Sequence, residues 1–216
     1  MSENPPPDSS TAPATAADAA RAILTTAIHR ADVVAAARSI LGTHLVGHGV
    51  SARITEVEAY AGPQDPASHA YRRTPRSQIM YGPADRLYVY RIHGHFCANV
   101  VTGPEGTASA VLLRAAEVID GVSRARERRT TGIGDAALAR GPGNLAAALA
   151  ITMADLGSDL ADGRPVHLYR PAQLESADVS IGPRVGVRRN ADAPWRLWLT
   201  GDPTVSAYRR HRAAHT

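Results

Sequence analysis

Lysine is absent from this 216-residue sequence, so all 24 residues of its Lys+Arg count are arginines. Without a side-chain amine, an imine-forming mechanism would have to use the amino terminus. Arginine makes bidentate contacts with phosphates and stacks on rings, so a polyanionic partner fits better than the formal charge of +4 suggests. The alternative explanation is genomic base composition, because Ala, Arg and Gly are abundant throughout.

Cysteine and long apolar runs are also scarce. The single cysteine, Cys97, excludes an internal disulfide and a zinc site built on several thiolates, which fits a reducing compartment. No apolar run is long enough to span a bilayer, and the first residues lack the features of a secretory signal. We therefore expect a soluble, cytoplasmic protein that does not contact a membrane.

The length suits one domain with a sizeable core. Residues 1–18 are rich in Pro, Ala and Ser and are predicted to be a disordered leader. A single folded domain is expected over 19–208, followed by a basic C-terminal tail over 209–216.

Hydrophobic periodicity and turn residues predict the elements of this domain. Helices are predicted over 32–41, 120–129, 135–140 and 144–151. Strands are predicted over 43–46, 51–60, 87–92, 96–102, 108–115, 166–169 and 196–200, with a long loop over 62–85. The predicted class is α+β, with a curved, mainly antiparallel β-sheet and surrounding helices.

The strand at 53–60 has two chemically different faces. Because side chains alternate along a strand, one face carries Glu56, Glu58 and Tyr60 and the other carries Thr55, Val57 and Ala59. A carboxylate beside an aromatic ring is what hydrolysis at a nucleobase needs. The alternative is that Glu58 is a solvated strand residue.

Arg114 follows the apolar run 110–113, and burial there would require an acidic or phosphate partner. Pairing with Glu58 would satisfy both residues.

Further along, Tyr88 and Tyr90 share one strand face. They are interpreted as rings that stack on a substrate or as core aromatics. His93 ends that strand before Gly94.

His93, His95 and Cys97 alternate as metal ligands can on a strand. Gly94 loosens their geometry, and spacing supplies no fourth ligand, so we expect no metal and no cofactor. The arginines within 123–129 are interpreted as a solvated helical face or as phosphate contacts. Thr74 and Arg76 lie in the long loop, and loops of that length are commonly functional.

Several segments together resemble the alkyladenine (methylpurine, or 3-methyladenine) DNA glycosylase family. They are RITEVEAYAG at 53–62, His69, TPRS at 74–77, LYVYRIHG at 87–94, Cys97 to Asn99, AVLLRAAEVIDG at 110–121, GPGNL at 141–145 and RVGV at 184–187.

The resemblance implies a monomeric, monofunctional glycosylase that flips an alkylated or deaminated purine out of double-stranded DNA and hydrolyses its N-glycosidic bond, leaving an abasic site. It implies that Glu58 is the general base, and that Arg114 and the carbonyl of Val185 help to hold the water. The base-binding residues implied are Tyr60 on one face of the base, His69 and Tyr90 on the other, and Asn99 against the amino group of normal guanine.

The implied DNA contacts include two departures from the family pattern. His93 stands where the family often has a tyrosine wedge, and the segment after it is one residue shorter. Asn144, after Gly143, stands where a lysine often contacts phosphate, so arginines such as Arg76, beside Thr74, would supply more of the charge. Met80 is expected at a second intercalating position or in the core.

Two other functions remain open. A non-catalytic damaged-DNA-binding protein would bind lesions without releasing a base, although intact Glu58 and Arg114 argue against it. A nucleoside hydrolase would act on free nucleosides, whereas the arginine-bearing loop favours a polymer.

Overall fold

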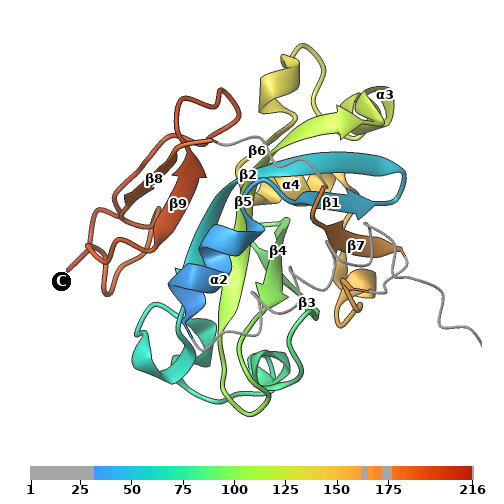
Figure 1. Ribbon diagram of the computed structural model, residues 1–216. Coiled ribbons are helices and arrows are strands. Elements are labelled where there is room, and N and C mark those ends of the chain that lie inside the picture. Colours follow the sequence, from blue (N-terminus) through green and yellow to red (C-terminus); the bar gives the residue numbers. More distant parts are fainter. Residues whose placement is uncertain (1–31, 162–164, 172–176, 216) are drawn as a thin grey trace, which may run out of the picture.

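The computed structural model describes residues 32–161, 165–171 and 177–215; the expected leader lies outside them. Within these ranges, nine strands form one sheet in which every pairing is antiparallel (Figure 1). The main strand order is β3-β4-β5-β2-β1-β7. These strands are β1 (His44–Gly47), β2 (Val50–Tyr60), β3 (Leu87–Ile92), β4 (His95–Val101), β5 (Ala110–Asp120) and β7 (Val166–Tyr169).

Strand β2 is shared by two branches of the sheet. Its first half pairs with β1, and Glu56 to Glu58 pair with β9 (Arg196–Leu199) on one side and with β5 on the other. Strand β8 (Val179–Gly182) pairs with β9, and the short β6 (Ala139–Arg140) pairs with β5. The C-terminal part of the chain is thereby attached to the middle of β2.

Two irregularities interrupt the pairing of β2 with β5. Ile54 is opposite Ala116 and Glu56 is opposite Ala115, so Thr55 has no partner in the ladder. The next pair joins Val57 to Leu113 and leaves out Arg114. Because β-bulges bend a strand and redirect side chains, this is where an arginine from β5 can turn toward the carboxylates of β2.

Three short α-helices accompany the sheet in the described residues: α2 (Val33–Ile40), α3 (Val122–Glu127) and α4 (Pro142–Ala148). The Asp32 carboxylate caps α2 by accepting from two main-chain N–H groups, as expected of an N-cap aspartate. Helix α2 packs against β2 and β5, and α4 against β4 and β5. The molecule is therefore mainly a curled antiparallel sheet with few helices, and the predicted set of surrounding helices is supported only loosely.

The structure differs from the sequence prediction in three places. The helix predicted over 135–140 is a 3₁₀ turn at Asp135–Ala137 followed by β6, because Ala139 and Arg140 pair with β5. Strand β8 was not predicted. The long loop over 62–85 is also more regular than expected, because it contains 3₁₀ turns at Gly62–Gln64, His69–Tyr71 and Gln78–Tyr81.

The main core lies between the sheet and helices α2 and α4, and includes Val57 and Ala59 of β2. The predicted opposition of these two residues to Glu58 and Tyr60 is therefore confirmed. A second, smaller core beneath the long loop contains Ala70, Met80, Tyr88, Val101, Ala108 and Ala110. No helix among the described residues is long and apolar enough to cross a membrane.

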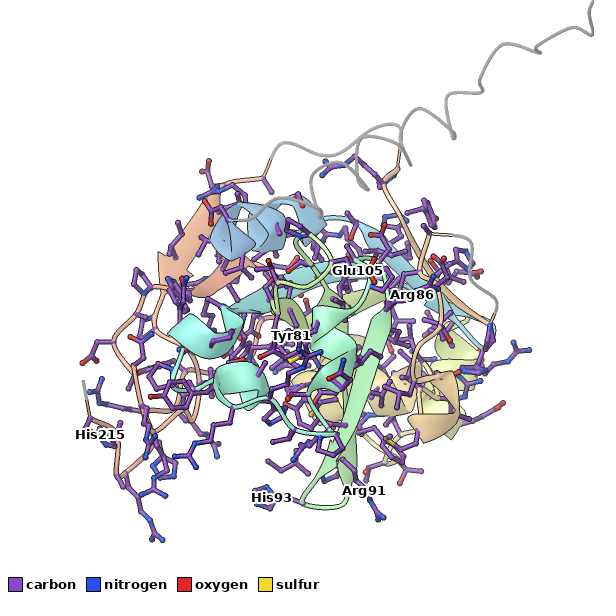
Figure 2. All side chains as sticks on the ribbon, turned by 90° about the horizontal axis from the view of Figure 1, so that it is seen from below. Tyr81, Arg86, Arg91, His93, Glu105 and His215 are labelled. Carbon is purple, nitrogen blue, oxygen red and sulfur yellow. The ribbon has the colours of Figure 1, made fainter. Side chains whose placement is uncertain are left out.

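The β3–β4 hairpin turns at His93 and Gly94, whose φ angles are 48° and 83°. Both central residues are in the left-handed region, as in a type I′ turn, and glycine adopts this region without penalty. Figure 2 shows Arg91 and His93 at the tip of this hairpin, projecting away from the body of the protein.

Candidate active site

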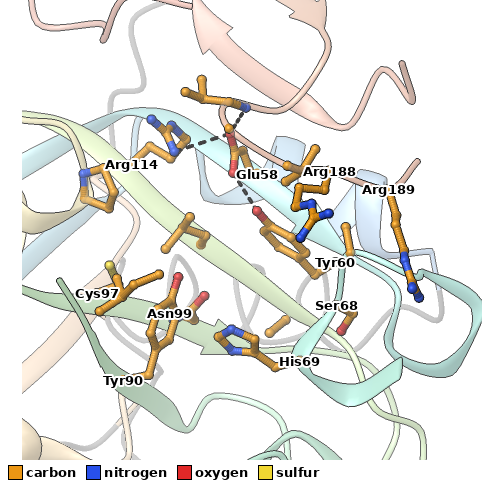
Figure 3. A pocket seen from close by; sticks show the side chains of 18 of the residues that line it. Glu58, Tyr60, Ser68, His69, Tyr90, Cys97, Asn99, Arg114, Arg188 and Arg189 are labelled. Atoms are coloured by element: carbon orange, nitrogen blue, oxygen red, sulfur yellow. Dashed lines mark hydrogen bonds and ion pairs between the residues drawn. The ribbon is translucent and has the colours of Figure 1, made fainter. Parts of the chain in front are cut away.

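A cavity of about 610 Å³ opens beside β2, β4 and β5 (Figure 3). This volume is within the range of about 300–1,000 Å³ that is usual for small-molecule sites. Its lining includes every candidate catalytic and base-binding residue predicted from the sequence: Glu58, Tyr60, His69, Tyr90, Asn99, Arg114 and Val185. Segments that are far apart in the sequence therefore meet at one cavity.

Glu58 is completely buried and is contacted by groups from three segments. Its Oε1 accepts from the main-chain N–H of Val185 at 2.7 Å and lies 3.4 Å from Nη1 of Arg114. Its Oε2 accepts from the Tyr60 hydroxyl at 2.8 Å. These contacts fix the carboxylate at the cavity wall, where it can accept a proton from a water molecule. The predicted pairing of Arg114 with Glu58 is confirmed.

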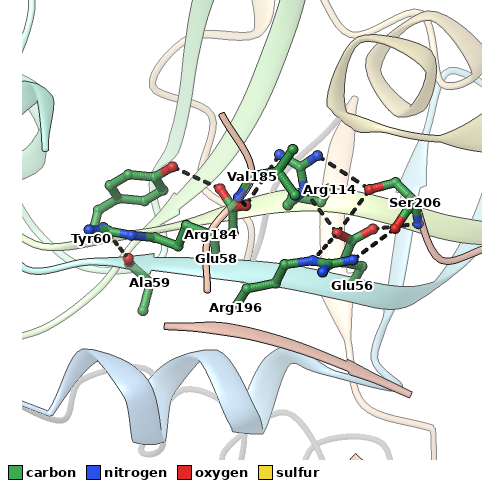
Figure 4. A network of polar contacts seen from close by, with 9 residues as sticks. All are labelled: Glu56, Glu58, Ala59, Tyr60, Arg114, Arg184, Val185, Arg196 and Ser206. Atoms are coloured by element: carbon green, nitrogen blue, oxygen red, sulfur yellow. Dashed lines mark hydrogen bonds and ion pairs between the residues drawn. The ribbon is translucent and has the colours of Figure 1, made fainter. Parts of the chain in front are cut away.

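Arg114 is also bound to a second carboxylate (Figure 4). Its Nε donates to Oε1 of Glu56 at 2.9 Å, and Oε1 also accepts from Nε of Arg196 at 2.6 Å. The hydroxyl and the main-chain N–H of Ser206 donate to the two oxygens of Glu56 at 2.9 and 2.8 Å. Glu58 and Arg114 thus belong to a larger network that the sequence did not predict.

Burial alone would raise the pKa of Glu56, but Arg114 and Arg196, together with the donors of Ser206, hold it below its ordinary value. The network therefore places the side chains of Glu56 and Glu58 against those of Arg114 and Arg196.

Aromatic rings face each other across the cavity, with Tyr60 on one side and His69 and Tyr90 on the other (Figure 3). The rings of His69 and Tyr90 meet edge to face, with centroids 4.6 Å apart. Burial, with a smaller contribution from Glu58, raises the pKa of Tyr60 well above its ordinary value. The Tyr60 hydroxyl therefore remains protonated and available as a donor to Glu58.

His69 is held by Tyr88, whose hydroxyl lies 2.9 Å from Nδ1. Burial, assisted by the charge of Arg76, lowers the pKa of His69 to about 4, so the imidazole is neutral at pH 7. Tyr88 also belongs to the second core, whereas Tyr90 only packs against it. Both tyrosines line the cavity, as their shared strand face predicted.

Asn99 occupies the cavity wall formed by β4. Its Nδ2 donates to the main-chain oxygen of Tyr88 at 3.0 Å, which fixes the amide against the strand. Cys97, two residues earlier on the same strand, also lines the cavity and is a buried free thiol. Burial raises the pKa of the Cys97 thiol above its ordinary value.

The candidate DNA-binding residues lie outside the cavity, with one exception. His93 is exposed at the hairpin tip, and Thr74 shares hydrogen bonds with Ser77 in a tight turn. The exposed Arg76 lies over the ring of Tyr90, 5.1 Å from its centroid, and so connects the long loop to the cavity wall. Their contacts with DNA remain predictions.

Met80 is the exception and a correction. It is 2% exposed, belongs to the second core and lines the cavity, so its side chain has no free surface with which to enter a duplex. The core alternative is the one observed.

The remaining two DNA-binding candidates, Gly143 and Asn144, lie at the start of α4. A Cβ on Gly143 would come within 2.9 Å of the Cβ of His95, so only glycine fits there without a shift. Nδ2 of Asn144 donates to the main-chain oxygen of Arg140 at 2.6 Å, which engages its amide within the protein.

The described residues contain no group of three or more His, Cys, Asp or Glu side chains that could hold a metal ion. His93 is in the turn rather than on the strand, so the alternating pattern with His95 and Cys97 is broken. The basic stretch at 123–129 is engaged internally: Arg124 and Arg128 donate to main-chain oxygens and Arg126 pairs with Asp135.

Sequence reasoning missed the residues at the cavity mouth. Val187, Arg188, Arg189 and His215 line it, and the main-chain N–H of His215 donates to the oxygen of Arg188 at 2.9 Å. Arg210 pairs with Asp192. The segment expected to be a basic tail therefore folds back on the loop that follows Val185. A paired basic signal, Arg188-Arg189 directly after RVGV, was present in the sequence.

Comparison with known proteins agrees with this geometry. The family described as methylpurine-DNA glycosylase (MPG) matches residues 27–203. Proteins of Mycobacterium bovis and Mycobacterium tuberculosis, each named "Putative 3-methyladenine DNA glycosylase", are 55% identical over 190 residues, covering 85% of this chain and 93% of theirs. A protein of the same name from Mycolicibacterium paratuberculosis is 56% identical over 187 residues, covering 83% and 90%.

The match extends over most of the chain and contains β1 to β9 as well as every residue of the predicted base pocket. On these grounds the chain belongs to the methylpurine-DNA glycosylase family.

Proposed function

We propose that this protein is a DNA glycosylase that removes 3-methyladenine and related damaged purines from duplex DNA by flipping the nucleotide and hydrolysing its N-glycosidic bond. The observation that carries the proposal is the position of Glu58, a buried carboxylate fixed by two hydrogen bonds and an ion pair at the wall of a ring-lined cavity. A flipped purine between Tyr60 and the pair His69–Tyr90 would bring its sugar toward this carboxylate.

In the proposed reaction Glu58 accepts a proton from the attacking water as that water adds to the sugar carbon. Arg114 and Val185 keep the carboxylate in place, and the carbonyl of Val185 is proposed to hold the water. As the bond to the base breaks, the sugar develops oxocarbenium character, which the negative charge of Glu58 stabilises.

The leaving group needs little help from the protein. A purine alkylated at N3 or N7 is cationic in DNA and departs as a neutral base, so a strong general acid is not required. Stacking on the rings contributes about 1–3 kcal/mol per base, which helps to hold a flipped base but gives limited discrimination. Deaminated purines such as hypoxanthine are neutral, and their release would require protonation of the base by a group not yet assigned.

Arginine supplies the proposed contacts with the duplex. Arg188 and Arg189 line the mouth of the cavity, and Arg76 lies beside Tyr90. These side chains are suited to phosphates on either side of a flipped nucleotide. Since the chain has no lysine, attack by water is favoured over a lyase step through a side-chain imine.

The test is single-turnover release of 3-methyladenine and hypoxanthine from duplex DNA. It compares chelator-treated wild type, Glu58→Gln and the matched control Glu105→Gln, which changes an exposed loop glutamate. We expect release by wild type and by the control but not by Glu58→Gln, with DNA binding retained by all three.

Tight binding of damaged duplex without release by the wild type would replace the proposal with the damage-binding function. Release from free nucleosides without a requirement for duplex would instead favour a nucleoside hydrolase. Equal loss of binding and release in Glu58→Gln would assign Glu58 a structural role.

A further inference from the structure

Arg184 is the largest of the fully buried side chains in the described residues, yet it does not line the cavity. Its Nη1 and Nη2 donate to the two oxygens of Asp65 at 2.6 and 2.9 Å, which is a bidentate pair. Both partners have fully buried side chains. Buried ion pairs are weak evidence for stability because desolvation is costly, so the position of this pair calls for another explanation.

The guanidinium group of Arg184 lies between two rings. Its carbon is 4.6 Å from the ring centroid of Tyr60 and 5.0 Å from that of Trp195. Since Tyr60 lines the cavity and Arg184 does not, the arginine supports this ring from outside. A planar guanidinium stacks on a ring face, whereas an ammonium group does not.

Arg184 also fixes the main chain between the two key residues of β2. Its Nη1 donates to the oxygen of Ala59 at 3.0 Å (Figure 4). The N–H of Ala59 donates to the oxygen of Trp195 at 2.8 Å. Ala59 separates Glu58 from Tyr60. The peptide groups that set the distance between the carboxylate and the stacking ring are therefore held from outside the cavity.

The Arg184 side chain also connects the two loops that carry Val185 and His69. Arg184 immediately precedes Val185, whose N–H binds Glu58. Asp65 begins the segment leading to His69: its carboxylate accepts from the N–H of Ala67, and its main-chain oxygen accepts from the N–H of Ser68. One guanidinium group thus joins the end of β2, the loop that carries His69 and the loop that carries Val185.

We propose that Arg184 is a positioning residue for base release, which fixes Tyr60 and the Val185 main chain relative to Glu58. This inference rests on the proposed glycosylase function. It predicts that loss of the bidentate, stacked geometry slows the chemical step, even where the fold and the DNA-binding surface are unchanged.

The first variant is Arg184→Lys, which keeps the charge near Asp65 but cannot form two parallel hydrogen bonds or lie flat between the rings. We expect single-turnover release of 3-methyladenine from bound duplex to fall about 100-fold, the scale of a small misplacement of reacting groups. Binding to duplex with an abasic site, which has no base to stack on Tyr60, should match wild type. The control Arg53→Lys makes the same change at an arginine that forms ion pairs with Glu117 and Asp202, and it should retain the wild-type rate.

The second variant, Arg184→Met with Asp65→Leu, removes both charges together, a change that buried pairs often tolerate. The methionine cannot donate to the oxygen of Ala59, so the same loss of rate is expected. Melting temperature and circular dichroism establish that each variant is folded, and the double variant decides the question if Arg184→Lys does not fold.

Wild-type release rates in either folded Arg184 variant would overturn the inference. So would parallel losses of base release and abasic-DNA binding, because they would indicate a general structural role. If wild type itself releases no base, the proposed function fails separately. Fluorescence of an ethenoadenine base in bound duplex would then still report whether stacking on Tyr60 changes between wild type and Arg184→Lys.

Discussion

Replacing Glu56 by glutamine should destabilise the protein strongly, although the two side chains have nearly the same shape. The carboxylate accepts from Arg114, Arg196 and both donors of Ser206. Glutamine offers one oxygen and an NH₂ group, so an amide donor would face at least one existing donor. Arg114 would retain Glu58 as a partner, but Arg196 would lose the only carboxylate with which it forms an ion pair among the described residues.

The size of the effect follows from burial. Glu56 is fully buried and Arg196 is 4% exposed. Removing one partner of a buried ion pair costs about 3–5 kcal/mol, because the other charge remains without compensation. A domain has about 5–15 kcal/mol of unfolding free energy in total, so a substantial fraction of its stability would be lost.

The assay is urea unfolding of wild type, Glu56→Gln, Arg196→Met and the double variant. Arg196→Met keeps an aliphatic chain over Trp198 but removes the charge that is paired with Glu56. Glu56→Gln should therefore cost clearly less unfolding free energy in that background. The pKa of Glu56 is lower folded than unfolded, so its stabilising effect is present above about pH 4.5 and is lost as the pH falls further. The difference between wild type and Glu56→Gln should therefore shrink in acid. A loss below about 1 kcal/mol at neutral pH, or the same loss in both backgrounds, would refute the reasoning.

Three further predictions concern the cavity and the hairpin. Because the pKa of His69 falls to about 4 on folding, the stability that its neutral ring contributes is present above pH 6.5 and is lost as the pH falls toward 4. His69→Asn should therefore show a smaller loss of unfolding free energy between pH 6.5 and 4. The same dependence of unfolding free energy on pH in both proteins would contradict the pKa shift. Tyr60→Phe keeps the ring but removes the donor to Glu58, so base release should slow about tenfold while lesion binding is retained. This factor is near the low end of about 1.5–3 kcal/mol for a hydrogen bond to a charged group. An unchanged rate would show that the hydroxyl is dispensable. His93→Ala should weaken binding to damaged duplex more than it slows cleavage of bound substrate in a single turnover, and an unaltered affinity would remove His93 as a wedge.

Local patterns predicted much of the sheet because they act over a few residues. The alternation along β2 gave the correct faces for Val57 and Glu58, and Gly94 marked the turn of the β3–β4 hairpin. The helical pattern over 32–41 likewise located α2. The helix predicted over 135–140 failed because pairing of Ala139 with β5 overrides local helical preference.

The contacts that complete the site have no local signature. Glu56 meets Arg196 and Ser206 across 140 and 150 residues of sequence, and Arg184 meets Asp65 across 119. The bulge that redirects Arg114 depends on the register of two strands rather than on the residue itself. The resemblance to a known family brought the pocket residues together, whereas the supporting charges could be found only from the fold.

The attachment of Ser206 to Glu56 predicts an order in which the site is completed during synthesis. The chain emerges from its N-terminus, and contacts between distant segments must overcome the entropy of closing a long loop. A nascent chain that already contains Glu58, Arg114 and Val185 still lacks the Ser206 donors that hold Glu56. We expect chains stalled before Ser206 to release damaged bases poorly, and full activity to follow only after synthesis of this last support.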